Sequence, residues 1–345
     1  MIKPIRLIVI YSIFFLPIAI MAHGRKKVPS YTLETDSPMV HDPVMAFEDN
    51  IYHMYSTGWG IQHMTSEDME NWQIKPTPLM TVIPGWTKDS VSGFQGHVWA
   101  PDIIRWHNRW YMAFSCSTFG RNSSAIGLLS NNSLDDRKPW TDNGCIISSR
   151  ENRNDWNAID PNFIIDESDT PWLTFGSFWS GIQIIKLDST MHMSEGWHPQ
   201  TIARRYALNS NNMTPNPTSK YAGVNAIEAP FIFHHGGYYY LFVSWDYCCQ
   251  GKKSTYRVAV GRSKNVTGPY VDSDGKPMLQ GGGSIIAEGD KKDFEAMGHC
   301  AIYHIKDKDI FICHGYSIAL DGVSILLKYD INWSTDGWPS LTPFK

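Results

Sequence analysis

The feature that most constrains the fold of this chain is a sequence motif that recurs five times along it. Each copy begins with an acidic or polar residue, often followed by proline, and continues as an apolar run, a short turn and a second, aromatic-rich run. Self-similarity at a nearly constant period is typical of repeat architectures, so the chain is expected to consist of five equivalent units. The copies begin 60, 58, 68 and 71 residues apart, at Asp42, Asp102, Asp160, Glu228 and His299.

The two apolar runs of each copy predict a β-hairpin. They alternate apolar and polar side chains and are joined by turn-forming residues, such as Glu48-Asp49-Asn50 in the first copy and Gly236-Gly237 in the fourth. Three or four strands per unit, with almost no helical periodicity, predict an all-β fold, a five-bladed β-propeller. The third strand-like runs are 61–65, 125–129, 182–187, 257–262 and 325–330.

An array of five independent β-sandwiches would also repeat five times. The units follow one another without linkers and carry too few strands for sandwiches, so we favour a single propeller domain over residues 23–345. With 42% hydrophobic, 13% aromatic and 19% charged residues, the composition excludes intrinsic disorder. The net charge of −4 and the lack of a long basic run argue against a nucleic-acid partner.

Residues 1–22 are predicted to be a secretory signal peptide. Lys3 and Arg6 precede the apolar run 7–22, and a polar segment follows it. The alternative is a membrane anchor, which needs about 20 apolar residues; this run is shorter and contains Pro17. We therefore expect an exported protein, periplasmic or extracellular, with no membrane association once the signal is removed.

The six cysteines fit an exported protein but follow no zinc-site spacing. We expect at least some of them to be buried free thiols. The adjacent pair Cys248 and Cys249 is not expected to form a disulfide, because the bridge would close a strained eight-membered ring. The other cysteines are Cys116, Cys145, Cys300 and Cys313.

The first residues of the five copies are expected to lie close together in the folded protein. Equivalent positions on the innermost strands of a propeller point toward one axis, so four carboxylates and one imidazole are expected to share a cavity. Like charges raise one another's pKa, so such a cluster is costly unless chemistry or a cation requires it. Paired carboxylates among aromatic side chains are typical of glycoside hydrolysis. The 14 Trp, 16 Tyr and 15 Phe can pack in a core or stack on sugar faces.

The segments around three of these acids resemble the catalytic motifs of glycoside hydrolase family 43. They are Val40-His41-Asp42-Pro43-Val44, Asn157-Ala158-Ile159-Asp160-Pro161-Asn162 and Asn225-Ala226-Ile227-Glu228-Ala229-Pro230-Phe231. The resemblance covers nearly all of residues 36–340. Further blocks look like the arabinanase branch of the family: 99–102, 175–182, 244–251, 260–263 and 267–270.

The resemblance implies hydrolysis of α-1,5-linked L-arabinofuranose chains, in arabinan or arabino-oligosaccharides, with inversion and in the endo mode. By motif, Asp42 would be the general base, Glu228 the general acid, and Asp160 the carboxylate that orients the acid and sets its pKa. An inverting pair stands about 6.5–9.5 Å apart. We expect Asp102 to be structural or channel-lining, and His41 to hold Asp42 ionised and oriented.

The family's arabinanases commonly hold a cation, usually calcium, beside a histidine of a Gly-His motif in the last blade, and Gly298-His299 matches. Met297 and Cys300 flank the pair where proline and asparagine are more usual. Calcium takes six to eight oxygen ligands, so we expect one Ca²⁺ that is largely water-coordinated and that is structural or supports the active site. The alternative is that His299 is a hydrogen-bonded channel residue without a metal.

Substrate contacts are also implied by the resemblance. Asn157 and Ser177 lie in motifs that face the sugar, and Trp99, Phe119 and Trp179 are expected near the same end of the channel. The protein is expected to be a monomer. Two alternatives stay open. One is an exo-acting arabinanase, α-L-arabinofuranosidase or β-xylosidase with the same three acids. The other is a non-catalytic polysaccharide-binding propeller, which would be expected to lack one of them.

Overall fold

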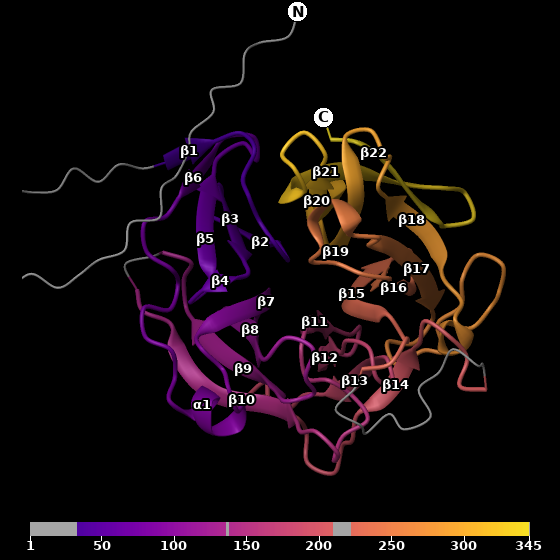
Figure 1. Cartoon of the computed structure of the whole chain (residues 1–345), viewed down its shortest axis with the longest axis horizontal. Coiled ribbons are helices and arrows are strands. Elements are labelled where there is room, and N and C mark those ends of the chain that lie inside the picture. The colour runs from indigo at the N-terminus through magenta and orange to yellow at the C-terminus, as the bar shows by residue number, and fades with distance from the viewer. Residues whose placement is uncertain (1–32, 136–137, 210–221, 345) are drawn as a thin grey trace, which may run out of the picture. The chain divides into compact units, whose positions relative to one another are not determined.

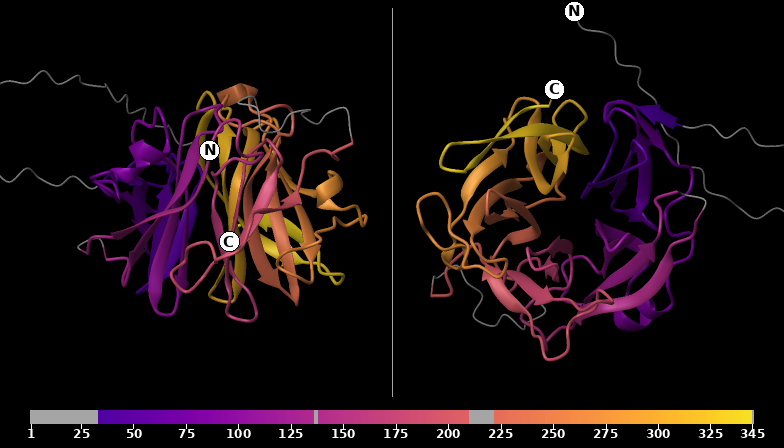
Figure 2. Two further views of the ribbon diagram at one scale, coloured as in Figure 1. Left: turned by 90° about the horizontal axis from the view of Figure 1, so that it is seen from below. Right: turned by 180° about the vertical axis from the view of Figure 1, so that it is seen from behind.

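The chain forms five antiparallel β-sheets arranged in a ring, so the predicted five-bladed β-propeller is confirmed (Figure 1). The computed structural model describes residues 33–135, 138–209 and 222–344. The predicted signal peptide, residues 1–22, lies outside this part of the chain. Figure 2 shows the ring from the side and from behind. Among the described residues, no helix is long and apolar enough to cross a membrane.

Each blade is a sheet of four or five strands. The first two blades also carry the short strands β1 and β4, and helix α1 (Trp86–Ser90) lies between β6 and β7 in the chain. Blade 1 comprises β1 (Leu33–Thr35), β6 (Trp72–Ile74), β5 (Gln62–Ser66), β3 (Ile51–Ser56) and β2 (Val44–Glu48). Blade 2 comprises β10 (Thr141–Ser149), β9 (Ser124–Asn131), β8 (Arg109–Ser117), β7 (His97–Trp106) and β4 (Gly58–Trp59).

The other three blades have four strands each, in chain order. Blade 3 comprises β11 (Asn162–Ile165), β12 (Pro171–Phe175), β13 (Ile182–Lys186) and β14 (Gln200–Ala203). Blade 4 comprises β15 (Ile227–His235), β16 (Tyr238–Trp245), β17 (Arg257–Ser263) and β18 (Ser284–Glu288). Blade 5 comprises β19 (Phe294–Ile305), β20 (Lys308–Ser317), β21 (Val323–Trp333) and β22 (Pro339–Pro343). Two 3₁₀ turns, η1 (Gly251–Lys253) and η2 (Met278–Gln280), flank β17 in the sequence.

All five predicted hairpins are present, each joining the first two long strands of a blade. In blade 1, Glu48 pairs with Ile51 across the turn, and in blade 4, His235 pairs with Tyr238. The predicted third strands are also found, as β5, β9, β13, β17 and β21. The period-2 pattern and the turn residues were therefore sufficient to predict the blade.

The ring closes between the last blade and the first. The innermost strands contact one another in the order β2, β7, β11, β15, β19 and back to β2. The segment before β2 pairs with β21, through a bridge between Met39 and Ile325 and a 3.0 Å hydrogen bond from the Leu326 N–H to the Pro38 carbonyl. Closure of the ring turns the inner edges of the sheets toward the central axis, where they are short and protected, as is general for propellers.

A kink near the start of each inner strand sets how its side chains face the axis. At this kink a non-glycine residue takes a left-handed φ, which is uncommon and costs about 1–3 kcal/mol unless the surroundings hold it. The five residues are Asp42, Ala100, Asp160, Ala229 and His299, with φ of 54°, 44°, 56°, 50° and 51°. These five residues occupy equivalent positions in the blades. The predicted set of equivalent residues is therefore wrong in two blades: Ala100 takes the place of Asp102, two residues away, and Ala229 takes the place of Glu228, one residue away.

The kinked backbone is held by the preceding blade in every case. At four of the five boundaries the N–H of the kinked residue donates to a side chain at the end of the previous blade's second strand. At the boundary between blades 3 and 4, the Ala229 N–H donates instead to Asp160 Oδ2, at 3.1 Å. The four acceptors are Thr57 Oγ1 for Ala100 (2.8 Å), Ser115 Oγ for Asp160 (3.0 Å), Ser244 Oγ for His299 (2.8 Å) and His314 Nδ1 for Asp42 (3.1 Å).

The cysteines divide as expected except for one pair. Cys116, Cys300 and Cys313 are buried free thiols, and Cys145 is a half-buried one. Cys248 and Cys249 form a disulfide, so the expectation against this bridge is wrong. Cys249 has a φ of +67° in the turn after β16, a backbone conformation that sequence reasoning did not anticipate and that accompanies the two facing sulfurs.

Loss of one boundary hydroxyl should destabilise the ring. Ser115→Ala removes the acceptor of the buried Asp160 N–H, and an unsatisfied buried donor costs about 1–3 kcal/mol. We expect the free energy of unfolding, measured by urea titration, to fall by that amount. Ser273→Ala is the matched control, because the Ser273 hydroxyl makes an exposed hydrogen bond and its loss should cost no more than about 0.5 kcal/mol. Equal stability of the two variants would contradict this account.

Candidate active site

Three of the predicted acids and the predicted imidazole line one cavity. Its volume is about 940 Å³, and Asp42, Asp160, Glu228 and His299 all contribute to its wall. All four side chains belong to residues that are at least nine-tenths buried, so they meet in a region of low solvent exposure. The cavity is thus the place where the kinks of blades 1, 3, 4 and 5 deliver ionisable groups.

Asp42 is surrounded by groups that favour its ionised form. Its Oδ1 lies 2.8 Å from His41 Nδ1 and 3.0 Å from His299 Nδ1, and Thr57 Oγ1 donates to its Oδ2 at 2.5 Å. Burial alone would raise the pKa of Asp42, but His299 and His41 hold that pKa well below its ordinary value of 3.8. Asp42 is therefore a buried carboxylate that stays ionised.

Glu228 has the opposite environment. Ser177 Oγ donates to its Oε2 at 2.7 Å, and the Tyr256 hydroxyl donates to its Oε1 at 2.8 Å. Burial raises the pKa of Glu228 above its ordinary value of 4.5, and these two neutral donors offset only part of that rise. No imidazole contacts this carboxyl directly in the described hydrogen bonds, so Glu228 holds its proton more readily than Asp42.

The pKa of Asp160 is affected by the charges of both of these acids. Burial raises its pKa well above 3.8; His299 opposes the rise, and the charges of Glu228 and Asp42 add to it. The described hydrogen bond to its Oδ2 comes from the N–H of Ala229, the residue after Glu228. Burial and the neighbouring negative charges therefore favour the protonated form of Asp160.

His299 is the main positive charge among the acids. Burial opposes its protonation, but Asp42, Asp160 and Glu228 raise the pKa of His299 to about 9. Gly298 precedes it because the Tyr256 ring occupies the space that a Cβ at position 298 would need. The Tyr256 side chain thereby contacts both the Gly-His motif and the predicted acid.

The residues around His299 provide few ligands for a cation. Its Nδ1 is already paired with Asp42, and among the described residues the potential ligand groups are His41 with Cys248 and Cys249, and His41 with Asp42 and His314. Neither group includes His299. Calcium prefers six to eight oxygens, so this donor set fits only a cation whose shell is mostly water.

Asp102 is placed away from the cavity. It is buried and accepts hydrogen bonds from the Phe163 N–H at 2.7 Å and from Asn162 Nδ2 at 3.3 Å. Burial raises the pKa of Asp102 to about 7. It connects blade 2 to blade 3, which agrees with the structural role expected for it.

The five predicted substrate-contact residues all line the cavity, but they differ in exposure. Phe119 is 76% exposed and Trp99 is half-buried, so both rings have a free surface. Trp179 is only 2% exposed and Asn157 only 3%, and Asn157 Oδ1 accepts a hydrogen bond from Ser124 Oγ. Ser177 is engaged with Glu228. Phe119 and Trp99 are therefore the side chains best placed to stack on a sugar.

Sequence reasoning missed the groups that support the acids. They are Thr57, Tyr256, His314 and Tyr316, whose hydroxyl is hydrogen-bonded to His41 Nε2 at 3.0 Å. A signal was available for some of them, because four of the five repeats end their second aromatic run in serine or threonine and the fifth ends it in His314-Gly315. No comparable repeat marks Tyr256 or Tyr316.

An ionised carboxylate and a protonatable carboxyl that face one cavity can hydrolyse a glycosidic bond, the first by activating water and the second by protonating the leaving oxygen. The fold and this pair of acids define the protein as a glycoside hydrolase. The chain belongs to glycosyl hydrolases family 43, whose family model matches residues 37–339.

Similar proteins have both endo and exo names. The chain is 40% identical over 308 residues to an extracellular exo-α-(1→5)-L-arabinofuranosidase of Cellvibrio japonicus (strain Ueda107), covering 88% of this chain and 86% of that one. It is 38% identical over 306 residues to an extracellular endo-α-(1→5)-L-arabinanase of Bacillus subtilis (strain 168), covering 88% and 87%. A crystal structure of an exo-1,5-α-L-arabinanase from a bovine ruminal metagenomic library matches with a TM-score of 0.83 and 48% identity, covering 90% and 99%.

The contrast between Asp42 and Glu228 predicts a bell-shaped pH dependence. The base is lost as pH falls through the lowered pKa of Asp42, below 3.8, and the acid is lost as pH rises through the raised pKa of Glu228, above 4.5. We expect kcat/KM for glycoside hydrolysis, measured from about pH 2 to about pH 9, to show both limbs, with the acidic limb confined to the lowest pH values. Circular dichroism at each pH provides the folding control. A flat profile over a range in which the protein stays folded would refute this assignment.

Proposed function

We propose that this protein is an exported glycoside hydrolase that cleaves α-1,5-linked L-arabinofuranose chains by an inverting mechanism. The observation that carries the proposal is the contrast within one cavity: Asp42 is kept ionised by two imidazoles, and Glu228 is kept protonatable by burial. The substrate follows from the similar proteins, which are named for action on α-1,5-linked arabinose.

In the proposed reaction, Glu228 donates its proton to the oxygen of the leaving sugar while Asp42 removes a proton from the attacking water. Water enters from the face opposite the leaving group, so the anomeric configuration inverts. Asp160 acts as a positioning residue: its carboxylate accepts the N–H of Ala229, the residue next to the acid. Trp99 and Phe119 would stack on the sugars of the bound chain.

Export is supported by two observations. Residues 1–22 have the charge and apolar order of a secretory signal, and both similar proteins from Cellvibrio japonicus and Bacillus subtilis are named extracellular. We propose a periplasmic or extracellular enzyme that works as a monomer, since one chain supplies every residue of the site.

A cation beside His299 is also proposed, held largely by water because the groups of potential ligands among the described residues include only one carboxylate, that of Asp42. It would stabilise negative charge in the cavity, and no step above depends on it. We expect added Ca²⁺ to raise the melting temperature of chelator-treated protein, and to have no such effect in His299→Ala. An unchanged melting temperature in the unmutated protein would count against the cation.

Removing the proposed acid should slow hydrolysis strongly and leave the fold intact. Glu228→Gln keeps the shape of the side chain but cannot donate a proton as a carboxylic acid, and loss of a general acid costs about 10²–10⁴-fold in rate. We expect kcat on linear arabinan to fall within that range. Glu288→Gln, at the exposed end of β18, is the matched control and should retain full activity.

The outcome separates catalysis from mere binding. Full activity in Glu228→Gln would disprove the mechanism. Binding of arabinan without hydrolysis by the unmutated protein would instead identify a non-catalytic polysaccharide-binding propeller.

We propose the endo mode, and the exo mode is the second candidate because two of the similar proteins have exo names. Early products from linear arabinan distinguish the two. Endo cleavage should release a ladder of oligosaccharides within the first few per cent of reaction, measured by chromatography with the Glu228→Gln protein as the blank. A single short product from the start would contradict endo cleavage and favour exo.

A further inference from the structure

The Cys248–Cys249 disulfide lies in the wall of the active-site cavity, and the proposed mechanism does not use it. Both residues line the cavity, Cys249 exposed and Cys248 half-buried. The two cysteines are adjacent in sequence. A disulfide stabilises a fold mainly by closing a loop, and its effect grows with the length of that loop. A bridge that closes no loop contributes nothing of this kind, so its role must be local.

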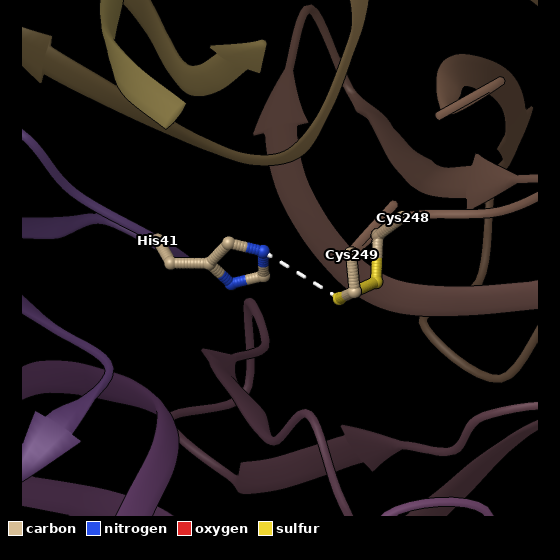
Figure 3. A group of neighbouring side chains, drawn as sticks. All are labelled: His41, Cys248 and Cys249. Carbon is tan, nitrogen blue, oxygen red and sulfur yellow. Dashed lines mark hydrogen bonds between the residues drawn. A yellow bond between two sulfur atoms is a disulfide. The ribbon is translucent and has the colours of Figure 1, made fainter. Parts of the chain in front are cut away.

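The disulfide borders the reacting groups on the Asp42 side. Cys249 Sγ lies 3.7 Å from His41 Nε2, and His41 Nδ1 lies 2.8 Å from Asp42 Oδ1. Figure 3 shows the His41 ring pointing at Cys249 from the segment before β2, with the sulfur bridge on the segment after β16. Only one imidazole therefore separates the sulfur from the proposed base.

The same segment reaches the proposed acid a few residues later, where the Tyr256 hydroxyl donates to Glu228 Oε1. The turn that carries the disulfide thus spans from the surroundings of one proposed catalytic acid to the other. A sugar bound between Asp42 and Glu228 has to lie next to this turn.

The turn is held in place by hydrogen bonds on both sides of the bridge. The Thr255 N–H donates to the Tyr247 carbonyl at 2.9 Å, the Gln250 N–H donates to Ser254 Oγ at 3.1 Å, and the Cys249 N–H donates to the Tyr316 hydroxyl at 2.8 Å. These contacts present the sulfurs as a fixed surface.

The surface next to the bridge is apolar. The Tyr247 ring is 42% exposed and lies 5.9 Å from the Phe178 ring, and both residues line the cavity. Sulfur is polarisable and packs well against apolar groups. The C–H face of a furanose is a partner of this kind.

We propose that the Cys248–Cys249 disulfide is a substrate-contact surface, which packs against the C–H face of an L-arabinofuranose unit bound beside Asp42. The inference rests on the proposed function. The bridge would contribute to binding of the sugar chain and leave the chemical step to the carboxyl groups. It is a sulfur counterpart of the aromatic surface formed by Trp99 and Phe119.

Kinetics of two double variants test the contact. Cys248→Ala with Cys249→Ala removes both sulfurs, and Cys248→Ser with Cys249→Ser replaces them by polar atoms of similar size. We expect KM for arabinohexaose to rise about 5- to 10-fold in each, equivalent to about 1–1.4 kcal/mol, with kcat changed less than about twofold. Cys145→Ser, a half-buried free thiol in β10 that does not line the cavity, is the control and should keep both constants.

An unchanged KM in both double variants would overturn the proposal. A fall in kcat with unchanged KM would also overturn it, because it would place the effect of the bridge on the contact from the Cys249 N–H through Tyr316 to His41 rather than on the sugar.

Reduction of the unmutated disulfide provides a second test that needs no cysteine substitution. Dithiothreitol supplies two electrons and two protons, so Cys248 and Cys249 become thiols and the reagent becomes a cyclic disulfide. Alkylation and mass spectrometry verify the change. In Glu228→Gln protein, we expect calorimetry to measure at least about threefold weaker binding of arabinohexaose after reduction. Equal affinity in the two states would refute the contact.

Different experimental results would refute the sulfur contact and the proposed function. If the unmutated protein hydrolyses arabinan and the cysteine variants keep their KM, only the contact is wrong. If the unmutated protein neither binds nor hydrolyses arabinan, the proposed function is wrong and the contact is wrong with it.

Discussion

The active site depends on one repeated hydrogen bond, from the backbone N–H of a kinked inner strand to the blade before it. A non-glycine residue with left-handed φ is unfavourable by itself, and here five of them stand at equivalent points of the ring. Side chains such as Ser115 and Ser244 accept this hydrogen bond at four boundaries, and the Asp160 carboxylate accepts it at the fifth. Because the kinks are held, Asp42, Asp160 and His299 face one cavity, and Glu228 joins them from the residue before its kink.

Asp42 and Glu228 differ in pKa because different groups contact each of them. Asp42 and Glu228 are both buried, and burial alone would raise the pKa of both. Two imidazoles adjoin Asp42 and reverse the direction, whereas the hydroxyls of Ser177 and Tyr256 at Glu228 cannot. His314, which accepts the Asp42 N–H, is neutral because burial lowers its pKa well below 6.5, so its Nδ1 is free to accept. One fold thus provides a base and an acid from two carboxyl groups.

The hairpins and the candidate catalytic acids could be predicted from the sequence, whereas the register of the acids could not, for a physical reason. The hairpins follow from alternation and turn residues, which are local. The register of the acids was aligned on the charged residue, whereas the structure sets it by the kinked residue before proline or its equivalent. Asp102 and Glu228 therefore fall out of register, and a bulge between Trp99 and Asp102 accompanies the shift.

Contacts across the closed ring were beyond local reasoning. His314 reaches Asp42 over 272 residues, and Tyr316 reaches His41 over 275. The Cys248–Cys249 bridge accompanies a left-handed φ at Cys249, which residue types alone do not reveal. The acids could be identified because motifs and repeats marked them, but the groups that tune them could not.

The stereochemistry of the first product tests the central claim most directly, that an ionised Asp42 activates water while Glu228 protonates the leaving oxygen. Proton NMR of the reducing end formed in the first minutes, before mutarotation, identifies its anomer. The account predicts the β-anomer from the α-linked chain, because water attacks opposite the leaving group. Initial formation of the α-anomer would mean a covalent intermediate and would contradict the role assigned to Asp42 as the base that activates water.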